Sequence, residues 1–229
     1  MSKLNWSQLI QDLRSKNIER SVHACEKIFE VANESHIPEL YSLLNDESFF
    51  IREAAASPLA RLEGVKALPF LLQAYTRGFQ DGHDNDGLTV TITELLEEKA
   101  EEVVPLLLEM LKSTDSETRA NAAWALGFTA SQITPRILLN LLESENNREV
   151  RLATIGSLSS FSGSPEVVEK LINLLSETDE QVRIEAIASL GYLGDKRAVV
   201  PLKEILDKST SSRVQEFVKH ALKNLNSQR

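Results

Sequence analysis

Apolar residues recur three to four positions apart along most of the chain, as in the segment VRIEAIASLGYLGD that begins at Val182. Val182, Ala186 and Leu190 occupy positions i, i+4 and i+8, which places them on one buried face of a helix. Gly194 then frees the backbone for a left-handed cap that ends this helix. Strict alternation of apolar and polar residues, the pattern of a strand, is missing from the sequence. The pattern predicts an all-α fold.

This helical segment is repeated along the chain. Similar segments are VRLATIGSLSSF from Val150, TRANAAWALGFT from Thr118 and IREAAASPLARL from Ile51. Each has an arginine at its second position, and steps of 32 residues connect Arg119, Arg151, Arg183 and Gln215, and also Arg20 and Arg52. The wider gap between Arg52 and Arg119 has room for one more unit with a short insertion. We therefore predict a right-handed α-solenoid of about seven two-helix repeats, which covers residues 1–229 as a single domain.

Each repeat is expected to contain two helices. The first begins near a proline, which a first helical turn tolerates because its missing N–H has no partner there. These prolines are Pro38, Pro105 and Pro135. The second begins after a residue that caps free N–H groups, four positions before the arginine or Gln215. The capping residues are Ser48, Asp115, Asn147, Asp179 and Ser211.

The repeated arginine has two possible roles. It could pair with acidic or carbonyl groups of the turns and tie one repeat to the next, or it could form a ladder that binds the anionic groups of a ligand. Because the arginine follows the repeat so regularly, the sequence favours the structural role.

Residues 179–202, DEQVRIEAIASLGYLGDKRAVVPL, resemble the short HEAT-like repeat, whose pattern is D-x-x-V-R-x-x-A-x-x-A-L-G-x-L-G-D-x-x-A-V-P-x-L. Repeats four to six match best, whereas ankyrin and tetratricopeptide signatures are missing. This short form is similar to the repeat of the phycobilisome lyases, the E/F-type proteins that attach bilins to phycobiliproteins. The resemblance implies an α-solenoid. Many bacterial proteins with such repeats only bind partners, so it leaves the function open.

The second helix lines the concave side in HEAT-type proteins, which implies a binding face. Positions two before, two after, five after and nine after the arginine share one side of this helix. The candidate residues are Glu117, Asn121, Trp124 and Phe128 in repeat four, the surface residue Glu185 and Tyr192 in repeat six, and Phe50 and Arg61 in repeat two. Trp124 is conspicuous because the equivalent positions hold Ser57, Gly156, Ala188 and His220. It is either an interface anchor or packing beside the irregular third repeat.

The third repeat is irregular and contains a longer loop at about 76–88. Candidate partner contacts in this loop are Asp81, His83, Asp84 and Asp86. A calcium loop of the EF type would need Asp at Gly82 and Glu at Thr93, so that motif is missing and no metal site is assigned. The loop is expected either to contact a partner or to be solvated, with Asn85 capping the next helix. Acidic residues follow it, at Glu94, Glu97, Glu98, Glu101 and Glu102.

Composition narrows the possible partners. The chain has 25 Lys and Arg against 34 Asp and Glu, and a net charge of −9 gives no general attraction to nucleic acid or to an anionic membrane. The single cysteine, Cys25, excludes a disulfide framework. Neither an apolar run of ~20 residues nor the apolar core of a secretory signal is found. We expect a cytoplasmic protein that binds another protein or a peptide, without nucleic-acid binding or membrane insertion.

Motifs of common enzyme classes are missing, among them H-E-x-x-H, G-x-S-x-G and the Gly-rich phosphate loops. None of the four histidines is followed by glutamate, which excludes the His-Glu iron site of deoxyhypusine hydroxylase. The first hypothesis is therefore a non-catalytic scaffold without a cofactor, centred on Trp124 and Phe128. The second, implied by the resemblance, is a bilin lyase subunit or tetrapyrrole chaperone. Its aromatic residues would stack a linear tetrapyrrole, and arginines such as Arg61 would receive the carboxylates.

Overall fold

In the computed structural model, the described residues are 5–83, 85–129 and 131–227, and they form α-helices and short 3-10 helices without any strand. Successive α-helices pair in the order that the 32-residue period predicts, so the all-α repeat architecture is confirmed. The chain divides into two compact units, Met1–Lys99 and Ala100–Arg229, and each is described by itself. The single domain over residues 1–229 stays a prediction.

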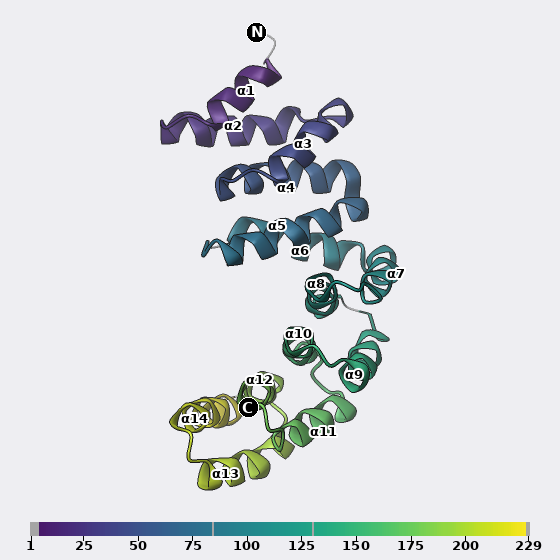
Figure 1. The fold of residues 1–229 in the computed structure, drawn as a ribbon, viewed down its shortest axis with the longest axis vertical. Coiled ribbons are helices and arrows are strands. Elements are labelled where there is room, and N and C mark those ends of the chain that lie inside the picture. Colours follow the sequence, from purple (N-terminus) through teal and green to yellow (C-terminus); the bar gives the residue numbers. More distant parts are fainter. Residues whose placement is uncertain (1–4, 84, 130, 228–229) are drawn as a thin grey trace. The chain divides into compact units, whose positions relative to one another are not determined.

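Unit 1 contains three helix pairs (Figure 1). They are α1 (Trp6–Leu13) with α2 (Ile18–Val31), α3 (Ile37–Leu44) with α4 (Phe49–Glu63), and α5 (Leu68–Gln80) with α6 (Asp86–Glu98). The 3-10 turns η1 (Glu34–His36) and η2 (Gly64–Ala67) lead into α3 and α5. Helices α2, α4 and α6 pack in succession and form the row that is called the inner row of unit 1 below.

Unit 2 contains four helix pairs. They are α7 (Ala100–Met110) with α8 (Ser116–Leu126), α9 (Thr134–Ser144) with α10 (Arg148–Leu158), α11 (Pro165–Leu174) with α12 (Glu180–Leu193), and α13 (Val199–Lys208) with α14 (Ser212–Ser227). The 3-10 turn η3 (Lys196–Ala198) precedes α13. The second helices α8, α10, α12 and α14 pack on one another more extensively than the first helices do, and they form the inner row of unit 2 (Figure 1).

The predicted buried stripe is confirmed in α12. Val182, Ala186 and Leu190 are 3%, 0% and 0% exposed. Gly194 has φ 73° and forms the left-handed cap that the sequence predicts. The stripe therefore faces the core, whereas Tyr192 of the same helix is exposed.

Two helical glycines of unit 2 face very different neighbours. A Cβ on Gly191 would lie 2.8 Å from the main-chain Cα of Ala221 in α14, whereas a Cβ on Gly156 would meet only the flexible Glu185 side chain, at 3.0 Å. Gly191→Ala should lower the free energy of unfolding by about 1–3 kcal/mol, because the two helices must separate. Gly156→Ala should leave it unchanged or raise it by about 0.5–1 kcal/mol through helix propensity.

Urea denaturation followed by circular dichroism compares these two variants. The assigned packing of α12 on α14 predicts opposite or clearly unequal shifts of the two midpoints. Equal shifts would mean that the backbones of α12 and α14 do not approach as closely as described.

The structure corrects several helix ends that the sequence predicts. Pro105 lies inside α7, which begins a turn earlier at Ala100 because Glu101 to Val104 continue the helical pattern. Ser48 occupies the N-cap position of α4 but its side chain makes no capping hydrogen bond. The N–H of Ser48 is bound instead by the carboxylate of Asp46, at 3.0 Å.

The insertion of the third repeat lengthens a helix and does not form a loop over 76–88. Helix α5 continues to Gln80 and α6 begins at Asp86. Asn85 is the N-cap residue of α6, but its side chain makes no capping bond. It is buried against Gly78 and donates to the main-chain oxygen of Tyr75 at 2.9 Å. The prediction that the Asn85 side chain caps α6 is therefore wrong. This side chain instead attaches the connection between the two helices to α5.

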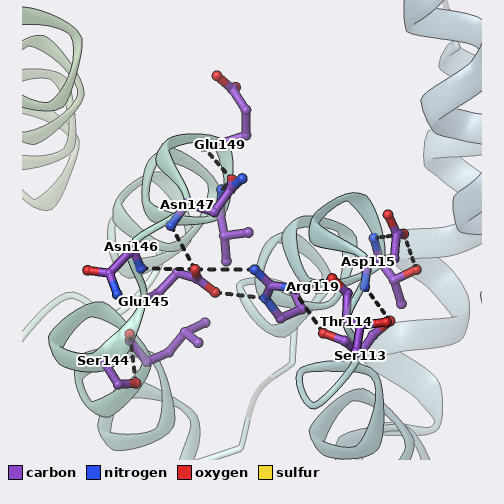
Figure 2. Close-up of polar contacts among 12 residues, drawn as sticks. Ser113, Thr114, Asp115, Arg119, Ser144, Glu145, Asn146, Asn147 and Glu149 are labelled. Carbon is purple, nitrogen blue, oxygen red and sulfur yellow. Dashed lines mark hydrogen bonds and ion pairs between the residues drawn. The ribbon is translucent and has the colours of Figure 1, made fainter.

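The structural role of the repeated arginine is confirmed at Arg119 (Figure 2). Its Nη1 donates to the main-chain oxygens of Ser113 and Thr114 at 2.9 and 3.1 Å, within its own repeat. Its Nε donates to the carboxylate of Glu145 in the next repeat, at 2.8 Å. One side chain thus closes the turn before its helix and connects two repeats.

The other repeats contain variations of this connection. Arg52 donates to the main-chain oxygens of Asp46 and Glu47 and to the carboxylate of Asp81. Arg151 reaches Glu177 at 2.8 Å, and Arg183 donates to two main-chain oxygens of its turn. In the last repeat, Gln215 donates to the main-chain oxygen of Ser209 at 2.7 Å. These contacts explain why the arginine follows the period.

The Arg119 connection predicts a pH dependence of stability. Hydrogen bonds from Arg119, together with the N–H groups of Asn146 and Asn147, hold the pKa of Glu145 below its usual value despite partial burial. A carboxyl group with a lowered folded-state pKa adds stability above its unfolded pKa, about 4.3, and this stability is lost as the pH falls through the folded value. Glu145→Gln should therefore weaken the dependence of unfolding on pH below that value.

Urea midpoints measured across the acid range check this prediction. Glu166 is exposed in unit 2, so Glu166→Gln serves as the matched control and should keep the wild-type dependence. If both variants follow the wild-type curve, the Glu145 carboxylate does not stabilise the folded state.

Candidate functional site

The predicted face of the second helices forms a surface on the inner row of unit 2. Neighbouring repeats contact each other along this surface. Arg213 of α14 donates to the side-chain oxygen of Gln181 in α12, at 3.0 Å. The Glu185 carboxylate of α12 lies over Gly156 of α10. The spacing from the arginine therefore identifies residues that line one face, although they are about 32 residues apart in the sequence.

Trp124 and Phe128 form an aromatic pair on this face. Both side chains are partly buried, and their ring centroids are 4.8 Å apart at a tilt of 58°. The main-chain oxygen of Trp124 accepts a hydrogen bond from Ser157 at 3.3 Å, which fixes α8 against α10. Asn121 is partly buried and Glu117 is exposed on the same helix. The pair offers an apolar, aromatic contact surface whose backbone is held by the next repeat.

Glu185 is partly buried, so its description as a surface residue is corrected. Burial raises the pKa of its carboxyl group because the charged form loses hydration. Since Gly156 has no side chain, Glu185 can lie flat across α10. A hydrogen-bond donor from a ligand would stabilise the ionised form of this carboxylate. Tyr192, two face positions further along α12, is 66% exposed.

The two remaining face candidates belong to unit 1. Phe50 is partly buried at the beginning of α4. Arg61, at the end of α4, donates to the main-chain oxygens of Phe29 and Ala32 at 2.9 and 3.0 Å. Its guanidinium carbon also lies 5.5 Å from the centre of the Phe29 ring. Arg61 therefore caps the end of α2, and its role as a receptor for ligand carboxylates stays a prediction.

Two of the candidate residues around the third-repeat connection contact other parts of the protein. Asp81 accepts from Arg52 at 3.1 Å, and His83 stacks on Phe49 with ring centroids 4.5 Å apart. Asp86 is exposed at the first turn of α6, and Asp84 lies outside the described residues. Among the residues that the structure describes, histidine, cysteine, aspartate and glutamate side chains do not gather into a group of three that could hold a metal ion.

Sequence reasoning missed a surface on α2. The face positions counted from Arg20 are Ile18, Val22, Cys25 and Phe29, and three of these apolar side chains are exposed: Ile18 by 78%, Val22 by 43% and Phe29 by 46%. The signal was available, because the same spacing that selects Trp124 also selects these residues. It was weak because repeat one departs most from the HEAT-like pattern.

Comparisons with known proteins identify the repeat type. HEAT repeats match residues 7–82, 83–159 and 135–223. Protein YibA of Escherichia coli K12 is 28% identical over 110 residues, which are 46% of this chain and only 39% of that protein. Within the described part of the chain, every helix falls short of the length and apolarity needed to cross a membrane.

Three solved structures with a similar arrangement are distant in sequence. The crystal structure of E. coli YibA is 17% identical, covers 98% of this chain and 93% of that one, and gives a TM-score of 0.44. An archaeal HEAT-like repeats protein from Thermococcus onnurineus is 11% identical with a TM-score of 0.47, covering 99% of each chain. The CpcE–CpcF complex of phycocyanin lyase from Nostoc is 18% identical with a TM-score of 0.42, covering 98% and 96%. At these scores the likenesses say nothing about activity.

Proposed function

Because the chain belongs to the HEAT-repeat family, we propose that it is a non-catalytic scaffold that binds a protein or peptide on the inner row of unit 2. The observation that carries this proposal is the aromatic pair of Trp124 and Phe128. The positions equivalent to Trp124 in α10 and α12 hold the small residues Gly156 and Ala188. The large side chain is therefore not a requirement of the repeat, and central tryptophans are the residues that most often anchor interfaces.

The surroundings of the pair suit a peptide ligand. An apolar side chain of the partner would cover the rings of Trp124 and Phe128. An N–H donor would meet the partly buried Glu185 carboxylate, and Tyr192 would close the contact at the rim. Stacked repeats hold these groups rigidly, so little ordering entropy is lost when the partner binds.

Affinity capture tests this proposal. Immobilised wild-type protein, Trp124→Ala and Val200→Ala are exposed to extract from the source cell, and retained proteins are quantified by mass spectrometry. Val200 is an apolar residue of α13 that is 65% exposed, so its truncation is a matched control away from the inner row. We expect a partner that wild type and Val200→Ala retain and Trp124→Ala loses. Equal retention by all three would contradict the proposed site.

A linear tetrapyrrole is the second candidate ligand, giving a bilin lyase subunit or tetrapyrrole chaperone. Two observations favour it: the aromatic pair offers a stacking surface, and residues 179–202 resemble the repeat of the phycobilisome lyases. Titration with biliverdin, followed by the absorption of the pigment, separates the candidates. A spectral shift with wild type that Trp124→Ala abolishes would support the pigment. An unchanged spectrum would exclude the pigment and favour the protein or peptide ligand.

A further inference from the structure

The inner row of unit 1 has a hollow that the proposed function does not use. It lies between α2 and α4 and has a volume of about 430 Å³. Its apolar lining consists of Cys25, Phe29, Ala54 and Pro58. A second hollow of about 370 Å³ shares Phe29 and continues to α6. The two together form a groove across the three inner helices of unit 1.

The hollow between α2 and α4 is acidic at its rim. Glu26, Glu30 and Glu53 line it, and its lining contains no lysine or arginine. Glu30 is bound by Lys27 at 2.6 Å, and Glu53 accepts from the N–H of Gly87 at 3.1 Å. Glu26 is exposed, and the Nδ1 atom of His23 lies 4.0 Å from its carboxylate. A hollow lined by both apolar side chains and carboxylates is complementary to a lysine or arginine, whose aliphatic stem is apolar and whose head is cationic.

The second hollow does not share this charge. Glu94 and Glu98 line it, but so do Arg61 and Lys99, so its formal charge is balanced. Electrostatic attraction for a cation is therefore concentrated in the first hollow. This difference fixes where along the groove the cationic side chain belongs.

Apolar side chains flank the acidic hollow on α2. Ile18, Val22 and Phe29 project from one side of this helix at positions i, i+4 and i+11, and all three are exposed. Their spacing matches one face of a helix, which normally packs against another element. Exposed apolar groups beside an acidic hollow are typical of a surface that binds a partner.

We propose that the inner face of unit 1 binds a peptide segment in which a lysine or arginine is flanked by apolar residues. The cationic head lies between Glu26 and Glu53, and its stem covers Cys25 and Ala54. The flanking apolar side chains pack on Val22 and Phe29. This site is separate from the Trp124 face of unit 2, and either one can exist without the other.

Fluorescence anisotropy with the full chain tests the chemistry of the site. The probe is a fluorescein-labelled peptide that alternates leucine with lysine, compared with a leucine–glutamate peptide and a serine–lysine peptide of equal length. Only the leucine–lysine peptide should bind well, because it alone supplies both the cation and the apolar flanks. Equal binding of the serine–lysine peptide would mean unspecific attraction to an acidic protein and would overturn the proposal.

Two double variants locate the binding. Glu26→Gln with Glu53→Gln removes two rim charges while keeping the side-chain shape and the acceptor for Gly87. Glu47→Gln with Glu97→Gln removes two exposed charges of unit 1 that do not line the groove. The rim variant should weaken binding about fivefold or more, and the control should stay within about twofold. Equal weakening would overturn the assignment.

The alkylation rate of Cys25 reports directly on whether the hollow is occupied. Cys25 is the single cysteine of the chain and lines the hollow, so alkylation reports on this site alone. Saturating leucine–lysine peptide should slow the alkylation of Cys25 severalfold in both wild type and Trp124→Ala. An unchanged rate would show that the peptide binds elsewhere. Loss of peptide binding in Trp124→Ala would likewise assign it to unit 2 and contradict the proposal, whereas the capture experiment above does not depend on this outcome.

Discussion

Leu190→Ala should lower the free energy of unfolding by about 2–5 kcal/mol. Leu190 is completely buried in α12, within the stripe that joins the inner and outer helices of unit 2. Truncation removes apolar surface from the core and leaves a cavity, because the surrounding helices relax only in part. Urea denaturation followed by the helical circular dichroism signal measures the change.

Val200→Ala is the matched control for this prediction. It also truncates an aliphatic side chain of unit 2, but Val200 is largely exposed, so the midpoint should stay close to that of wild type. Similar losses in the two variants would mean that α12 is rotated about its axis relative to the assigned face. That result would also move Glu185 and Tyr192 away from the surface proposed for binding.

Arg52→Ala should lower the free energy of unfolding by about 2–4 kcal/mol. Arg52 is 0% exposed, and its guanidinium satisfies the main-chain oxygens of Asp46 and Glu47 as well as the carboxylate of Asp81. Alanine leaves a cavity and removes the donors from these groups. The turn before α4 and the connection after α5 should both loosen.

Arg20→Ala tests whether burial causes this effect. Arg20 occupies the equivalent position in repeat one, but its side chain is 56% exposed and pairs with Asp12 at the surface. Its removal should leave the unfolding midpoint near that of wild type, because water replaces the lost contact. Comparable destabilisation by both substitutions would contradict the assignment of Arg52 as a buried connector.

The regular repeats could be predicted from the sequence in considerable detail. Arg119, Arg151 and Arg183 share a period, so a single local pattern predicts their main-chain contacts within the repeat, and Arg119 and Arg151 also reach a carboxylate of the next repeat. The caps at Asp115, Asn147 and Asp179 follow for the same reason, and each accepts main-chain N–H groups as expected. In a repeat protein, each repeat contacts its neighbours through the same set of positions, so a local pattern also specifies tertiary contacts.

The irregular regions could not be predicted in this way. Asn85 has the residue type and the position of a helix cap, but the nearby Gly78 leaves space that draws its side chain back to α5. Arg61 has the position of a binding residue, but the end of α2 offers carbonyl oxygens that it satisfies. In both cases the competing partner lies in another helix: Tyr75 is 10 residues before Asn85, and Phe29 is 32 residues before Arg61, at the equivalent position of the preceding repeat. The groove of unit 1 could not be predicted either, because its lining combines side chains from three helices.

The affinity of the purified partner for Trp124→Ala tests the central claim most directly. Isothermal titration should show a loss of about 2 kcal/mol or more relative to wild type, as expected for a central aromatic anchor, with Phe128→Ala similar and Glu117→Ala smaller. The helical melting curve of Trp124→Ala should remain close to that of wild type, so that lost binding does not reflect lost folding. If Trp124→Ala instead unfolds the protein at lower temperature while each folded molecule binds with unchanged affinity, Trp124 belongs to the core. The partner would then not be anchored at Trp124 on the inner row of unit 2.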